Sequence, residues 1–379
     1  MKNVSREHIA WVDLLRILAC FLVIVSHSCD AFVGQSDNNY TDFLSGSLIG
    51  SLVRPCVPLF VMISGLLLLP VNMEMTTFYS KRAKRLLLPF VFWALTLPVL
   101  YFLYVNYSGI TIVSPFIDSA DFTLGNTLQK MYTFVFNFNY DTTPLWYIYM
   151  LIGLYLFMPI LSAWLVQAKK RDIKWFLRIW IVSMLLPYIQ FVAPMLGYTG
   201  NGGNMGLLGI CDWNVYGTFY YFSGFIGYVV LAYYLKKYPL QWSMGKTLQL
   251  AIPLFLLGYA ITAAGYIYMH RFFPGSVAHT ELVWLFTGIN VFMMTYSVYI
   301  VFQKLKVSSN ALMSKIAALT FGIYLCHFVF VQFAYDIVYP NIPVPAVFKI
   351  LIIALLSFGI SLFIIWLMSL NKYTRKVIM

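Results

Sequence analysis

The chain has 379 residues, of which 61% are hydrophobic and 10% are charged, and its formal net charge at pH 7 is +12. A soluble protein of this length does not have so apolar a composition, so we predict an all-α polytopic membrane protein. The basic residues gather in particular loops, as orientation signals do, which argues against nucleic acid as a partner.

Ten apolar stretches are long enough to cross a hydrocarbon core of about 30 Å, which predicts a bundle of about ten transmembrane helices. They lie near residues 10–29, 46–69, 86–106, 145–166, 175–195, 216–235, 248–269, 282–303, 317–338 and 347–370. Clusters of Lys and Arg recur in every second connecting segment, so the positive-inside rule places both chain termini in the cytoplasm. We expect one membrane-embedded domain over residues 1–379, with no appended soluble domain.

The first predicted span contains Arg16 and His27, eleven positions apart. On a helix this spacing places both on nearly the same side, roughly 16 Å apart along the axis. Charged or polar residues inside a membrane span cost free energy, so they commonly have a function there. His27 can act as a general base, or it can be a histidine satisfied at the membrane interface. Asp13 lies three residues before Arg16 and can form a charge-compensating pair with it.

The second predicted span contains Arg54, which is followed by Pro55 and Pro58. Proline removes a backbone donor and leaves a carbonyl without its helical partner. Arg54 can satisfy such carbonyls, or it can stabilise a developing oxyanion. Because this span runs from the outside to the inside, we expect Arg54 at a depth similar to that of His27.

A run of cations, Lys81, Arg82 and Arg85, stands at the cytoplasmic start of the third predicted span. It can hold a multiply phosphorylated ligand, or it can be an ordinary positive-inside cluster against anionic lipid. In the ninth predicted span Tyr324 and His327 share a helix face, and this pair is typical of packed residues hydrogen-bonded within the bundle. Metal-ligand, P-loop and GxSxG motifs are absent from the sequence, and no metal site is expected.

Two connecting segments on the predicted outer side, residues 107–144 and 196–215, are longer than a turn requires. Their polar and aromatic residues can bind a glycan, or the segments can be flexible surface loops.

Five short motifs are spread over nearly the whole chain. They are Asp13-x-x-Arg16 with His27, Val57–Gly65, Arg82-x-x-Arg85, Pro144–Tyr149 and Phe321–His327. In this order they resemble the acyltransferase-3 family, which consists of integral-membrane O-acyltransferases of bacteria. The chain looks most like the compact members that acetylate lipid-linked or capsular sugars. Phe321-Gly replaces the Tyr-Ser often found in the last motif, so catalytic roles for Tyr324 and His327 are not expected.

The resemblance implies a multi-pass enzyme of the bacterial inner membrane. Such an enzyme takes an acyl group, usually acetyl, from cytoplasmic acyl-CoA and passes it to a hydroxyl of a surface or lipid-linked polysaccharide. Acetyl-CoA is then a donor substrate, and no permanently bound cofactor is expected. In the family, the residue that matches His27 is catalytic and the arginine that matches Arg16 is essential. The arginines that match Arg82 and Arg85 are associated with the acyl donor.

We therefore predict that His27 deprotonates a sugar hydroxyl, with Arg54 as a candidate for stabilising the oxyanion and Lys81 as a further donor contact. A covalent acyl-histidine is the alternative chemistry. The rival function is a membrane transporter or flippase of glycan precursors that uses the same cations as anion contacts. The sequence lacks the matching halves typical of such transporters.

Overall fold

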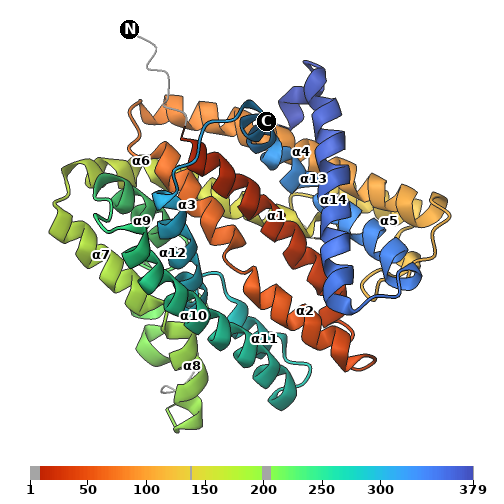
Figure 1. Ribbon diagram of the computed structural model, residues 1–379, viewed down its shortest axis with the longest axis horizontal. Helices are drawn as coiled ribbons and strands as arrows, with labels where there is room; N and C mark the ends of the chain where they lie inside the picture. Colours follow the sequence, from red (N-terminus) through yellow and green to blue (C-terminus); the bar gives the residue numbers. More distant parts are fainter. Residues whose placement is uncertain (1–8, 137–138, 199–205, 379) are drawn as a thin grey trace. The chain divides into compact units, whose positions relative to one another are not determined.

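The computed structural model describes residues 9–136, 139–198 and 206–378, and these residues contain helices and no named β-strand (Figure 1). Residues 199–205, within the second long connecting segment, lie outside the described residues. The chain divides into two compact units. Unit 1 comprises Met1–Cys56, Met73–Leu156 and Leu305–Met379, and unit 2 comprises Val57–Asn72 and Phe157–Lys304.

Unit 1 is built on three helices that run in the same direction. They are α1 (Ala10–Val33), α4 (Met75–Tyr107) and α13 (Ala311–Asn341). Contacts between α1 and α13 advance along both helices together, from Cys20 with Thr320 to Phe32 with Tyr335. The C-terminal halves of these helices therefore meet at one end of the unit, and their N-terminal halves begin at the other.

The other helices of unit 1 complete this bundle. They are α2 (Tyr40–Leu52), α5 (Leu124–Tyr132), α14 (Ala346–Leu370) and the first part of α6 (Trp146–Gln167). In Figure 1, α14 in blue runs beside α1 in red, and Phe21 packs edge to face against Phe358. The side chain of Asn39 caps α2 by accepting hydrogen bonds from the amides of Thr41 and Asp42.

Unit 2 contains α3 (Cys56–Leu68) from Val57 onward, the rest of α6, α7 (Lys170–Ser183), α8 (Leu186–Met195), α9 (Ile226–Lys237), α10 (Met244–Phe272), α11 (Val277–Trp284) and α12 (Ile289–Lys304). A close approach of two helices involves Gly65, where a Cβ atom would lie 2.7 Å from the carbonyl oxygen of Val229. Glycine at this position therefore lets α3 and α9 pack backbone against backbone.

Three predicted spans are each formed by two joined helices. The span predicted over 46–69 is α2 and α3, with a turn at residues 53–55 between them. Pro55 explains this break, because the residue before a proline is disfavoured in the helical conformation. The spans predicted over 175–195 and 282–303 are the pairs α7 with α8 and α11 with α12.

Within the described ranges, nine helices or joined helix pairs are long and apolar enough to cross a membrane. They confirm the prediction of an all-α polytopic membrane protein. The predicted span over 216–235 differs, because its regular α-helix, α9, begins only at Ile226 and has 12 residues. Gly217 and Gly224 have φ values of 48° and 79°, in the left-handed region. A regular α-helix cannot include such residues, so α9 begins only after them, at Ile226. The predicted orientation of the chain across the membrane remains a prediction.

Candidate functional site

Arg16 and Arg85, the second arginine of the Arg82-x-x-Arg85 motif, lie within electrostatic range of each other at the end of unit 1 where α1 and α4 begin. Arg16 is half-buried, and Asp13, Arg85 and Tyr155 all lie within electrostatic range of its guanidinium. Asp13 brings an opposite charge within range of Arg16, and its role as the compensating partner stays a prediction. Arg85, by contrast, adds a second cation within electrostatic range of Arg16, and an anionic ligand would offset the repulsion between the two.

The helical start of α4 is held in place by the part of α6 that belongs to unit 1. The Tyr79 hydroxyl donates a hydrogen bond of 2.6 Å to the Leu156 carbonyl oxygen, and the ring of Phe78 lies 6.4 Å from that of Tyr155. The Arg82 guanidinium lies 5.5 Å from the centre of the Phe78 ring, in a cation–π contact. Lys81 is exposed at the same end of α4. The predicted donor residues therefore share one end of the unit.

His27 lies toward the opposite end of α1 and is oriented by Asp30. Its Nδ1 donates a hydrogen bond of 2.8 Å to Asp30 Oδ2. A carboxylate can only accept, so Nδ1 holds the proton and Nε2 of the neutral imidazole keeps a lone pair. A carboxylate that fixes the histidine tautomer in this way prepares the ring as a general base. Sequence reasoning missed Asp30, although its i, i+3 spacing from His27 was the available signal.

His327 of α13 lies beside His27, with ring centroids 5.4 Å apart. It is fully buried, and its Nδ1 donates a hydrogen bond of 2.6 Å to the Tyr324 carbonyl oxygen. The lone pair of His327 is therefore on Nε2, which has no hydrogen-bond partner in the described part of the chain. The Tyr324 hydroxyl donates instead to the Pro144 carbonyl oxygen. The structure thus brings His327, but not the Tyr324 hydroxyl, to His27.

Arg54 occupies the turn between α2 and α3. Its side chain is only 7% exposed, and it lies within electrostatic range of Cys29, two residues beyond His27 on α1. Arg54 thus lies near the part of α1 that carries His27, and its depth in the membrane stays a prediction. Its role, like those of the other candidate residues, remains a prediction.

Aromatic rings surround the two histidines. The Phe328 ring lies 5.0 Å from His27 in an edge-to-face arrangement and 5.2 Å from Tyr140. Tyr140 belongs to η2 (Tyr140–Leu145), a short 3-10 helix that leads into α6.

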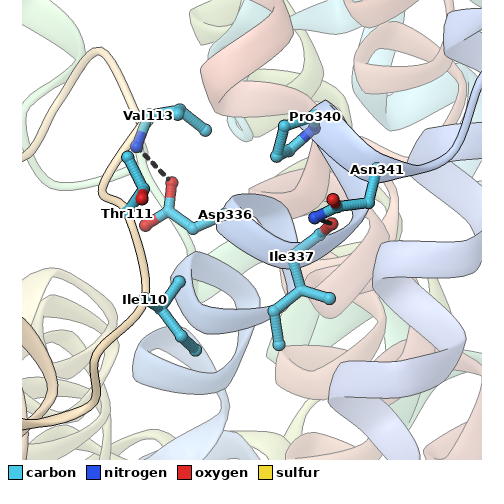
Figure 2. A pocket seen from close by; sticks show the side chains of 7 residues that line it. All are labelled: Ile110, Thr111, Val113, Asp336, Ile337, Pro340 and Asn341. Carbon is cyan, nitrogen blue, oxygen red and sulfur yellow. Dashed lines mark hydrogen bonds between the residues drawn. The ribbon is translucent and has the colours of Figure 1, made fainter.

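Asp336, nine residues after His327 on α13, holds the segment that follows α4. Its Oδ1 accepts hydrogen bonds of 2.9 and 2.8 Å from the amides of Val113 and Ser114, and its Oδ2 accepts one from the Tyr104 hydroxyl. Figure 2 shows Asp336 reaching across to Val113 at the wall of a pocket of about 400 Å³. The carboxylate is fully used in these bonds, so its role in the structure is to anchor the segment.

The comparisons with known proteins bear on the whole chain. A family model described as an acyltransferase domain matches residues 9–370, which include every candidate residue above. Neither the comparison with curated proteins nor the comparison with solved structures found a match. Because the family model covers nearly the entire chain, this membrane protein belongs to the acyltransferase-3 family.

Proposed function

We propose that this membrane acyltransferase is an O-acyltransferase that moves an acyl group, acetyl first of all, from acyl-CoA to a hydroxyl of a surface or lipid-linked polysaccharide. The observation that carries the proposal is the 2.8 Å hydrogen bond from His27 Nδ1 to Asp30, which leaves Nε2 as a base. Membership of the acyltransferase-3 family supports acyl transfer as the reaction. The enzyme would lie in the bacterial inner membrane, with its donor end in the cytoplasm.

The donor would bind through its phosphates at the end of unit 1 that carries Arg16, Arg82 and Arg85. Arginine suits this role because its planar guanidinium binds phosphate oxygens in a bidentate manner. The eleven residues from Arg16 to His27 span roughly 16 Å of helix. The long, flexible pantetheine arm of CoA is suited to carrying a thioester over such a distance. The phosphates would then lie at the arginines and the reacting carbon at His27.

The chemical step would begin when His27 Nε2 accepts the proton of the sugar hydroxyl. The hydroxyl oxygen attacks the thioester carbonyl carbon and forms a tetrahedral oxyanion, which Arg54 would stabilise. The carbon–sulfur bond then breaks, and the thiolate takes the proton back from His27. Asp30 stabilises the imidazolium between these two transfers, as the carboxylate of a catalytic triad does.

His327 would not serve as an oxyanion donor in this scheme. Its proton is held on Nδ1 by the Tyr324 carbonyl oxygen, so Nε2 presents a lone pair and not a hydrogen. Arg54 is therefore the better candidate for the oxyanion, because a guanidinium keeps its charge at every relevant pH.

The proposal is tested with purified protein, radiolabelled acetyl-CoA and glycan extracted from a strain that lacks the gene. The wild-type protein should transfer label to the glycan, and His27→Ala should abolish transfer while expression and thermal stability are retained. His270→Ala, at the end of α10 in unit 2, is the matched control and should stay active. Full activity of His27→Ala, or a wild-type protein that labels no glycan, would refute the proposed function.

A further inference from the structure

Helix α7 of unit 2 is held in a fixed rotation by its buried face. Its buried residues Ile173, Leu177 and Trp180 recur at helical spacing, and the Trp180 indole nitrogen donates a hydrogen bond of 2.9 Å to the Gly224 carbonyl oxygen. A Cβ atom at Gly227 would lie 1.9 Å from the Trp180 ring, so glycine at this position makes room for the ring. These contacts determine which residues of α7 lie on its opposite, exposed face.

The exposed face of α7 carries three cations in one stripe. Arg171, Lys174 and Arg178 are all exposed, and their spacing of three and four residues places them on the same side of the helix. The stripe extends over about 10 Å along the helix axis. Trp175 is exposed beside it, and the Arg178 guanidinium lies 4.8 Å from the centre of the Trp175 ring, in a cation–π contact.

The structure records no ion pair for these three cations within its described residues. Asp172, the nearest acidic residue in the sequence, lies about 100° or more away from each of them around the helix axis. The helix that carries the stripe is the first part of the candidate membrane span Lys170–Met195. The uncompensated positive charge therefore lies where a membrane span begins.

The depth of Arg178 distinguishes the stripe from an ordinary basic cluster in a loop. Arg178 lies about 12 Å along the axis from the start of the span at Lys170. An arginine this far into a span costs free energy in hydrocarbon, so its side chain should extend back toward the membrane interface. Helical side chains tilt toward the N-terminus, which directs the Arg178 guanidinium toward Lys174 and Arg171. Stacking on Trp175 leaves the N–H groups at the guanidinium edge available to a ligand.

A phosphate group at the membrane interface matches this arrangement. A guanidinium binds two phosphate oxygens at once, and an ammonium group adds a point charge. Tryptophan is typical of the interface, where its ring lies at the level of the lipid headgroups. Val182, one turn beyond Arg178 on the same face, is exposed and offers an apolar surface to an acyl chain. A phospholipid supplies both parts, the phosphate and the chain, in the matching order along the helix.

We propose that Arg171, Lys174, Trp175 and Arg178 form a binding site for an anionic phospholipid on α7. The lipid phosphate accepts hydrogen bonds from the two arginines, Lys174 adds a third positive charge, and Trp175 orients the Arg178 guanidinium. The net negative charge of the headgroup provides the preference over a zwitterionic lipid. This site lies in unit 2 and goes beyond acyl transfer, because it concerns the lipid around the protein and not the two substrates.

Lipid binding is measured by native mass spectrometry of the full-length protein, titrated with phosphatidylglycerol or phosphatidylcholine. The wild-type protein should bind phosphatidylglycerol more tightly. Arg178→Gln should weaken phosphatidylglycerol binding by about fivefold, the effect of one cation beside an anionic lipid, and the double variant with Arg171→Gln should weaken it further. Arg271→Gln is the matched control and should bind as wild type does, because Arg271 is also exposed and lies 5.8 Å from the Phe272 ring, but at the C-terminal end of α10.

A second measurement locates the lipid on α7. Phosphatidylglycerol with brominated acyl chains should quench part of the tryptophan fluorescence of the wild-type protein and a smaller part in Trp175→Phe, which keeps an aromatic ring under Arg178. Each variant should unfold at the wild-type temperature without added lipid, because the substituted side chains are exposed and form no ion pair among the described residues. Equal quenching in Trp175→Phe and wild type would place the lipid elsewhere and refute the site.

The remaining outcomes also decide the proposal. Wild-type binding of both lipids with equal affinity, or unchanged phosphatidylglycerol binding in Arg178→Gln, would show that the stripe does not select an anionic lipid. An equal loss in Arg271→Gln would show general attraction to positive charge. Inorganic phosphate that displaces phosphatidylglycerol at equal concentration would show a site for a dissolved anion. Each of these results would overturn the lipid site.

Discussion

His27 and His327 lie at opposite ends of the sequence, yet their rings are 5.4 Å apart on two helices that run in the same direction. Each ring donates through Nδ1, to Asp30 in one case and to a backbone carbonyl in the other. Both Nε2 atoms therefore keep lone pairs. Only His27 is backed by a carboxylate, so it is the ring that we propose as the general base.

The carboxylate of Asp30 should matter for the rate of the reaction and not for the binding of either substrate. In Asp30→Asn the side chain can still orient His27, but the charge that stabilises the imidazolium is lost. We expect kcat to fall by about 100-fold or more, with little change in either KM. Steady-state kinetics with both substrates varied would check this. Asp37→Asn, just beyond the end of α1, is the control, and a kcat within twofold of wild type in Asp30→Asn would contradict the prediction.

His327 should act as a positioning residue for His27. In His327→Phe the ring is kept and the two nitrogen atoms are removed, so packing against His27 is largely preserved. We expect kcat to fall by about tenfold while both KM values remain unchanged, because the polar neighbour of the base is lost. Thermal unfolding should show a native-like transition. A purely structural role would instead lower stability and leave kcat per folded molecule at the wild-type value.

The sequence was informative where the chemistry of a single element carries the signal. The apolar stretches predicted the membrane class, and the spacing of Arg16 and His27 predicted two polar positions on one helix, at different depths. The breaks within spans were only partly visible. Pro55 marked the turn after α2, but the unwinding before α9 depends on backbone conformations at Gly217 and Gly224 that composition does not reveal.

The missing part of the candidate site depends on contacts between distant elements. Asp30 was within reach of local reasoning, because it lies three residues from His27 on the same helix. The approach of His327 was not, because it requires the relative rotation and register of α1 and α13. Periodicity identifies a buried face but does not identify what that face contacts.

Removing Arg85, which lies within electrostatic range of Arg16, should change the stability of the donor-free protein little. Arg85 is exposed and lies within electrostatic range of Arg16, so the two repel each other until an anion lies between them. We expect Arg85→Ala to leave the thermal stability of the free protein unchanged and to raise the KM for acetyl-CoA by about tenfold. The acceptor KM should not change. Lys84→Ala removes a neighbouring exposed charge and is the control; an equal effect there would point to general attraction and not to a site.

Asp336 should be more important for stability than for chemistry. Its carboxylate is buried and accepts hydrogen bonds from the amides of Val113 and Ser114 and from the Tyr104 hydroxyl. In Asp336→Ala these donors lose their acceptor inside the protein, which should cost about 2–3 kcal/mol or more. Asp336→Asn keeps one carbonyl oxygen for the two amides and should cost about half as much.

Thermal unfolding in detergent, followed by limited proteolysis of residues 108–117, would measure both effects. Asn341→Ala is the matched control, because Asn341 lines the same pocket and its side chain bonds only to the Ile337 carbonyl oxygen within the described structure (Figure 2). We expect the segment to become sensitive to protease in Asp336→Ala and to remain protected in the control. Equal protection in Asp336→Ala and wild type would show that packing, and not this carboxylate, holds the segment in place.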